Sequence, residues 1–158
     1  MRRKKVITLN IILIAAILLG IFVYRQATTI AGDKFVDALK ELKFSTVEIE
    51  VTKDDSSSSD VLVSRKLTAE ELSSFYEHLG VSTFRTFDFG EKKIESPYRI
   101  TLTFLDSRDN QATVIRFTYN EYMNFHIHNE NTQISENCRI TVSSLGAFWD
   151  TFIQEAEQ

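Results

Sequence analysis

The sequence predicts an α+β domain in which helices pack on one face of an antiparallel sheet, preceded by a single transmembrane helix. Three observations support this prediction. A long apolar stretch without charge stands near the start of the chain. Several later segments alternate apolar and polar residues, which is typical of strands with one buried face. Other segments repeat apolar residues at helical spacing, so helices are expected to cover the apolar face of the sheet.

The predicted membrane segment is Val6–Tyr24, nineteen residues without a charged side chain. As a helix it would be about 28 Å long, close to the ~30 Å thickness of the apolar part of a bilayer. Four basic residues, 2–5, stand directly before it. Because positive residues are retained on the cytoplasmic side, we expect residues 1–5 to be a cytoplasmic tail and the C-terminal part to lie outside the cell membrane.

A cleaved signal peptide is the alternative interpretation of this stretch. Signal peptides usually have a shorter apolar core, about 7–15 residues, followed by a small-x-small cleavage site. Here Tyr24-Arg25-Gln26 follows the apolar run directly, and the best available cleavage site is Thr29-Ile30-Ala31. The length of the apolar run and this weak site favour an uncleaved anchor.

Residues 25–43 are predicted to form a helical tether, and residues 44–158 a single extracytoplasmic α+β domain. Within 27–43, apolar residues recur at helical spacing, with charged residues between them. This helix could extend from the membrane as a stalk or pack on the domain, and its apolar stripe favours packing. The stripe consists of Phe35, Val36, Leu39 and Leu42.

A hairpin and a capped helix follow. Alternation predicts strands at 44–53 and 61–66, joined by an acidic, serine-rich loop at 54–60. That loop lacks the glycine and the distal glutamate of a calcium-binding EF-hand loop, so we interpret it as a solvated hairpin tip. Thr68 and Glu71 then have the spacing of a capping box.

The capped helix is predicted to end at Gly80. Beyond it, the pattern becomes β-rich and closes with a helix that begins at Ser143 or Ser144. That last helix has an apolar stripe, which is Leu145, Phe148, Trp149, Phe152 and Ile153. The predicted strands are 83–89, 98–104, 113–119, 123–127 and 138–142.

The charge distribution argues against nucleic-acid binding. The chain has a net charge of −4, but its first 25 residues contain five basic and no acidic side chains. The remainder therefore has 13 basic and 22 acidic residues, and it shows no basic stripe. Such an acidic domain would repel a phosphate backbone.

The chemistry-bearing residues are few. Cys138 is the only cysteine, which excludes an intramolecular disulfide, and its alternation with Ile140 predicts a small buried apolar residue rather than a nucleophile. His126 and His128, with Glu130, are two residues apart and could project together from a strand as ligands for zinc or a similar metal. An ordinary polar sheet face explains the same pattern, and we prefer that interpretation.

No serine elbow and no glycine-rich phosphate loop occurs in the sequence, so neither an enzyme nor a cofactor is expected. The early hairpin, the entry Leu67-Thr68-Ala69-Glu70-Glu71-Leu72 and the expected pairing of Tyr98–Leu102 with Val114–Phe117 resemble small uncharacterised membrane-anchored extracytoplasmic domains of Gram-positive bacteria. The resemblance implies a bacterial surface location but no activity.

These observations favour a membrane-anchored binding or accessory domain. Its exposed sheet face or loops would contact another envelope protein or a peptide, while residues 6–24 would contact the membrane. An immunity-type or inhibitory envelope protein is an alternative with the same architecture. A metal-dependent enzyme built on His126 and His128 is the third possibility.

Overall fold

The computed structural model of the chain describes residues 2–55, 58–86, 96–108, 111–119, 122–128 and 133–157. The description covers only the backbone, not the side chains, at residues 2–11, 55, 58, 111–112, 126–128, 133–137, 142 and 156. Within these limits the chain forms four helices and one antiparallel sheet of eight strands. The predicted α+β class with an antiparallel sheet is therefore confirmed.

The strands of this sheet follow the order β1-β4-β8-β7-β6-β5-β2-β3, so the two edges are formed by β1 and β3. Each neighbouring pair is antiparallel. The strands are β1 (Thr29–Ala31), β2 (Thr46–Asp55), β3 (Ser58–Lys66), β4 (Thr83–Arg85), β5 (Tyr98–Leu105), β6 (Gln111–Thr118), β7 (Tyr122–His128) and β8 (Gln133–Val142).

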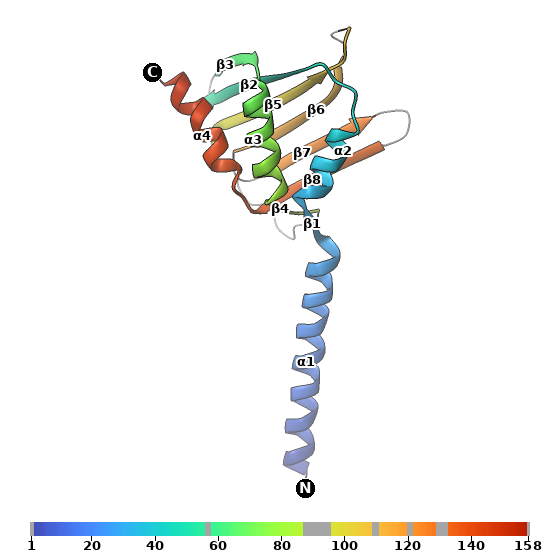
Figure 1. Cartoon of the computed structure of the whole chain (residues 1–158). Coiled ribbons are helices and arrows are strands. Elements are labelled where there is room, and N and C mark those ends of the chain that lie inside the picture. The colour runs from blue at the N-terminus through green and yellow to red at the C-terminus, as the bar shows by residue number, and fades with distance from the viewer. Residues whose placement is uncertain are drawn as a thin grey trace.

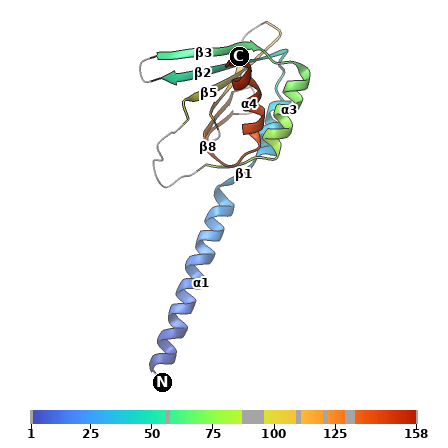
Figure 2. The same cartoon turned by 90° about the vertical axis from the view of Figure 1, so that its left-hand side faces the viewer.

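Three helices cover one face of the sheet, and the first helix projects away from it (Figure 1). The covering helices are α2 (Gly32–Lys40), α3 (Ala69–Gly80) and α4 (Leu145–Ala156). The view from the side shows α3 and α4 together on the same side of the strands (Figure 2). The opposite face carries no helix within the described residues, and we call it the open face.

The core lies between the covering helices and the alternate, inward-facing residues of the strands. The aromatic side chain of Trp149 is fully buried there and packs on Phe75, Phe117 and Phe148, with ring centroids 4.9–6.0 Å apart. The whole predicted stripe of α4 is buried, as are the inward residues of β5. Cys138 is buried as well, which confirms its interpretation as a core residue.

The helix predicted over 27–43 is interrupted. Helix α1 (Arg2–Thr28) ends where β1 pairs with β4, and a separate helix, α2, begins at Gly32. Phe35 and Leu39 of α2 are buried in the core. Residues 29–40, expected to belong to a helical tether, are thus an edge strand and a covering helix, because the apolar stripe of α2 is buried against the sheet.

Smaller differences concern the ends of elements. The hairpin strands extend further into the predicted loop, to Asp55 on one side and from Ser58 on the other. The strand expected at 83–89 is described only for Thr83–Arg85. Gly80 is the last residue of α3, and the cap is Val81 in right-handed conformation.

Helix α1 makes few contacts with the rest of the protein. Its apolar side chains from Ile12 to Val23 are 48–63% exposed and point to all sides of the helix. Over the described residues, no helix combines the length and the apolar character needed to cross a membrane. The transmembrane segment expected at residues 6–24 therefore stays a prediction.

Candidate functional site

The open face carries a concentration of arginines from four different strands. Arg85 on β4, Arg99 on β5, Arg116 on β6 and Arg139 on β8 each lie next to a buried residue in the sequence. Because side chains alternate between the faces of a strand, these four project away from the core. All four line one cavity of about 610 Å³, which we call the arginine cavity.

The strand register explains how residues distant in the sequence meet there. Arg85 lies directly opposite Arg139, and Arg99 lies directly opposite Thr118. These positions belong to a single row that crosses seven strands at right angles. The row is Thr29, Arg85, Arg139, Tyr122, Thr118, Arg99 and Thr52. Neighbouring strands are about 4.8 Å apart, so the row from Arg85 to Arg99 spans roughly 19 Å.

A second row beside the first adds a fourth arginine and neutral polar groups. Arg116 lies opposite Thr101 on one side and Asn124 on the other, and all three line the arginine cavity. Arg116 is exposed. Guanidinium groups flanked by hydroxyl and amide groups supply many hydrogen-bond donors, which suits carboxylate and phosphate oxygens.

The arginines differ in how far the protein itself neutralises them. Arg99 forms an ion pair with Asp54, which also accepts a 3.0 Å hydrogen bond from Ser59. These contacts lower the pKa of Asp54, with the Arg99 bond as the main cause. At Arg85, the buried Nε has no hydrogen-bond partner among the described residues. Arg85 and Arg139 occupy directly opposite positions on their strands, which brings two guanidinium groups to the same part of the cavity.

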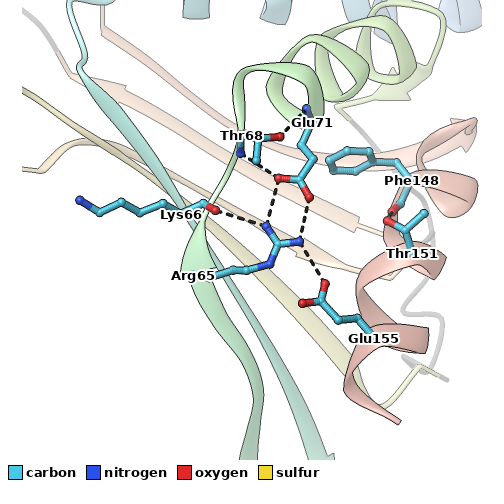
Figure 3. Close-up of polar contacts among 7 residues, drawn as sticks. All are labelled: Arg65, Lys66, Thr68, Glu71, Phe148, Thr151 and Glu155. Carbon is cyan, nitrogen blue, oxygen red and sulfur yellow. Dashed lines mark hydrogen bonds and ion pairs between the residues drawn. The ribbon is translucent and has the colours of Figure 1, made fainter. Parts of the chain in front are cut away.

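A second polar cluster, on the helix side of the sheet, connects α3 and α4 to β3 (Figure 3). Arg65 donates two hydrogen bonds to Glu71, of 2.8 and 3.0 Å, and one of 3.0 Å to Glu155 on α4. Its guanidinium also lies 5.0 Å from the centre of the Phe152 ring. Mainly through the bonds from Arg65, the pKa of Glu71 falls to about 2, and that of Arg65 rises further above its usual range.

This cluster has a structural role. Glu71 also accepts a 2.8 Å hydrogen bond from the Thr68 amide, and Thr68 Oγ1 accepts one from the Glu71 amide at 3.2 Å. The predicted capping box is thereby confirmed. Every charged group of the cluster is paired within it, so it offers no free charge for a ligand.

The one histidine whose side chain the structure describes is half-buried between two helices. His78 Nδ1 lies 3.1 Å from Ser144 Oγ, and its carbonyl accepts hydrogen bonds from Ser144 Oγ and Ser82 Oγ. Ser143 and Ser144 are the two residues predicted to cap α4. Ser144 occupies the cap position, but Ser143 Oγ accepts the bond from the Leu145 amide because the Ser144 hydroxyl is engaged at His78.

The predicted metal ligands cannot be assessed in the same way. His126 and His128 lie on β7, as expected, but their side chains and the whole of Glu130 are outside the described residues. In the remainder, no three histidine, cysteine, aspartate or glutamate side chains are grouped to hold a metal ion. The metal interpretation stays a prediction.

Comparison with known proteins gives no match: no family model, curated protein or solved structure is significantly similar to the chain. The geometry of the arginine cavity is therefore the main indication of function. Sequence analysis did not identify this site. In the sequence, each of the four arginines stands beside an inward-facing apolar residue, which indicates that it lies on the outer face of its strand. This pattern does not indicate which strands are neighbours in the sheet.

Proposed function

We propose that the protein is a membrane-anchored extracytoplasmic binding domain whose open face binds an anionic ligand. The observation that carries this proposal is the arginine cavity. Four of the 13 basic residues beyond residue 25 line it, although the same part of the chain has 22 acidic residues. Such a cluster of guanidinium groups raises the positive potential locally, within the cavity.

The size of the cavity indicates the kind of ligand. The arginines extend along about 19 Å of the open face, and hydroxyl and amide groups lie between them. An elongated ligand with more than one carboxylate or phosphate group would contact several guanidinium groups at once. A peptide rich in acidic residues, or the acidic surface of an envelope protein, has this chemistry.

The anchor is proposed from α1. An isolated helix with apolar side chains exposed on all sides is unfavourable in water and favourable in a bilayer. The nineteen uncharged residues Val6–Tyr24 would be long enough as a helix to cross the apolar part of a bilayer. For residues 6–11 of this stretch, the structure describes the backbone but not the side chains. The basic residues 2–5 favour a cytoplasmic N-terminus and an extracytoplasmic domain.

Anion binding to the open face is testable with the full chain in detergent micelles or phosphatidylcholine nanodiscs. At constant ionic strength, citrate or a poly-glutamate peptide should raise the melting temperature relative to chloride, because a ligand that binds only the native state stabilises it. Replacing Arg116→Gln should weaken this effect, and the double variant Arg116→Gln, Arg139→Gln should abolish it. Arg116 is exposed, so its replacement should leave the fold intact.

The matched control is Arg108→Gln. Arg108 is exposed and follows the last residue of β5, whereas Arg99, which lines the cavity, is near the first residue of that strand. Arg108 is therefore at the opposite end of β5 from the arginine cavity. The control variant has the same change of charge and should keep the full response. Equal responses from wild type, control and double variant would mean that the anions act through general charge, and the proposal would be wrong.

A further inference from the structure

A second cavity lies where α1 meets the sheet. It has a volume of about 410 Å³, and its lining includes Phe22, Arg25 and Gln26 of α1, together with Thr29 and Arg85. We call it the junction cavity. Phe22, Arg25, Gln26 and Thr29 stand at positions i, i+3, i+4 and i+7, which places them along one side of the helix and its continuation. Thr29 lies directly opposite Arg85 in the pairing of β1 with β4.

The two cavities share Arg85, which lines both. β4 and β1 are the strands nearest to α1, and the remaining strands lie progressively further from it (Figure 1). The row of arginines therefore starts beside α1 and continues outward over the open face. In the proposed orientation, the junction cavity is at the membrane surface and the arginine cavity leads away from it.

The junction cavity has a different chemistry on its two sides. Phe22 belongs to the apolar run that ends at Tyr24, whereas Arg25 and Gln26 follow directly after it. At the end of a membrane-spanning helix, such residues lie at the depth of the lipid headgroups. An apolar wall below and two guanidinium groups above are complementary to an amphiphile with an anionic head.

We infer that the junction cavity binds the phosphate of an anionic membrane lipid, held between Arg25 and Arg85, with the lipid chains along Phe22. The buried Nε of Arg85, without a hydrogen-bond partner among the described residues, is a donor available to a phosphate oxygen. Guanidinium–phosphate contacts are charge-assisted and often bidentate. The inference rests on the proposed membrane anchor, because only a chain anchored through α1 would hold the junction cavity beside the lipid headgroups.

The test uses the full chain in nanodiscs made from an equal mixture of phosphatidylglycerol and phosphatidylcholine. After release from the disc, native mass spectrometry counts the lipids that remain bound. Wild type should retain phosphatidylglycerol in preference to phosphatidylcholine. Because each guanidinium group would donate a charge-assisted hydrogen bond to the phosphate, the preference should fall about tenfold or more in Arg25→Gln or Arg85→Gln, and disappear in the double variant. Arg108→Gln, the matched control, should behave as wild type.

Three outcomes would overturn the inference. The first is a wild type that retains both lipids equally, and the second is a double variant that keeps the preference. Arg25→Gln is informative even if Arg85→Gln impairs folding, because Arg25 is an exposed residue of α1, before the first strand. The third is that wild type shows no lipid preference in the mixed discs, while inorganic phosphate raises its melting temperature in discs of pure phosphatidylcholine and this rise requires Arg25 and Arg85. The site would then bind free phosphate.

Failure of the anchor is recognised separately by alkaline carbonate extraction of membranes that contain the full chain. A chain that is released by carbonate disproves the anchor and, with it, the lipid site. A chain that stays in the membrane but shows no lipid preference disproves only the lipid site.

Discussion

Gly32, the first residue of α2, lies in close contact with the backbone at the end of α3 and in the turn after it. Its amide donates a 2.9 Å hydrogen bond to the Ser82 carbonyl, at the end of the turn after α3. A Cβ atom at this position would lie 1.7 Å from the Leu79 carbonyl oxygen and 2.9 Å from the Ser82 carbonyl oxygen. Both contacts are with backbone atoms, so a side chain could be accommodated only by moving α2 away from α3.

We therefore expect Gly32→Ala to destabilise the protein by about 1–3 kcal/mol, the usual cost of overpacking. Chemical denaturation followed by tryptophan fluorescence measures this, because the single tryptophan is in the core.

Gly80→Ala is the matched control for this substitution. Its added Cβ would find only Val36 Cγ2 at 3.8 Å, an ordinary contact. Alanine is the better helix former by roughly 0.5–1 kcal/mol, so this variant should be as stable as wild type or more stable. Equal effects of the two substitutions would contradict the close approach of α2 to α3.

At the scale of elements, the Arg65 cluster joins β3, α3 and α4 through one guanidinium group. The capping box of α3 was visible in the sequence, because Thr68 and Glu71 are three residues apart. The contacts of Glu71 with Arg65, and of Arg65 with Glu155 and Phe152, depend on how the helices pack on the sheet.

The variant Glu71→Gln separates these two contributions. Glutamine can keep the capping box but loses the ion pair with Arg65. The pKa of Glu71 is about 2 in the fold, below its usual value of 4.5. A carboxyl group whose pKa is lowered by folding contributes its full stabilisation when the pH is above its usual pKa. This stabilisation is lost as the pH falls through the usual pKa toward the pKa in the fold.

We expect Glu71→Gln to be less stable than wild type by about 1 kcal/mol at pH 7, the upper end for a partly exposed ion pair. The difference should shrink as the pH falls from 4.5 toward 2. Urea denaturation over this pH range measures it. The control Glu70→Gln changes an exposed carboxylate in the same helical turn and should have a smaller effect. A difference independent of pH would show that the ion pair contributes nothing.

The arrangement of the whole molecule makes the proposed topology testable. A membrane-impermeant thiol reagent should label Asp60→Cys, an exposed position on β3, in intact cells but should not label Arg3→Cys. The native Cys138 is only 1% exposed and should contribute little background. After permeabilisation, the reagent should label both introduced cysteines.

The reverse labelling pattern would contradict the orientation that the basic residues 2–5 predict. A mature protein that begins near Gly32 would show instead that the apolar segment is a cleaved signal peptide.

The sequence by itself determined the fold class, the position of most elements and most of the core. Period-two alternation identified the strands, and the stripe around Trp149 identified α4, because both patterns are local consequences of burying one face. The same patterns identified Cys138 as a buried residue, and the spacing of Thr68 and Glu71 identified the capping box.

Only the tertiary structure decided the break at Gly32 and the composition of the candidate site. The break depends on contacts with Leu79 and Ser82, some fifty residues away. Arg85, Arg99, Arg116 and Arg139 lie on four strands, and their convergence follows from the order β4-β8-β7-β6-β5 and its register. Alternation tells which face of a strand a side chain occupies, but strand order is a non-local property that no short stretch of sequence contains.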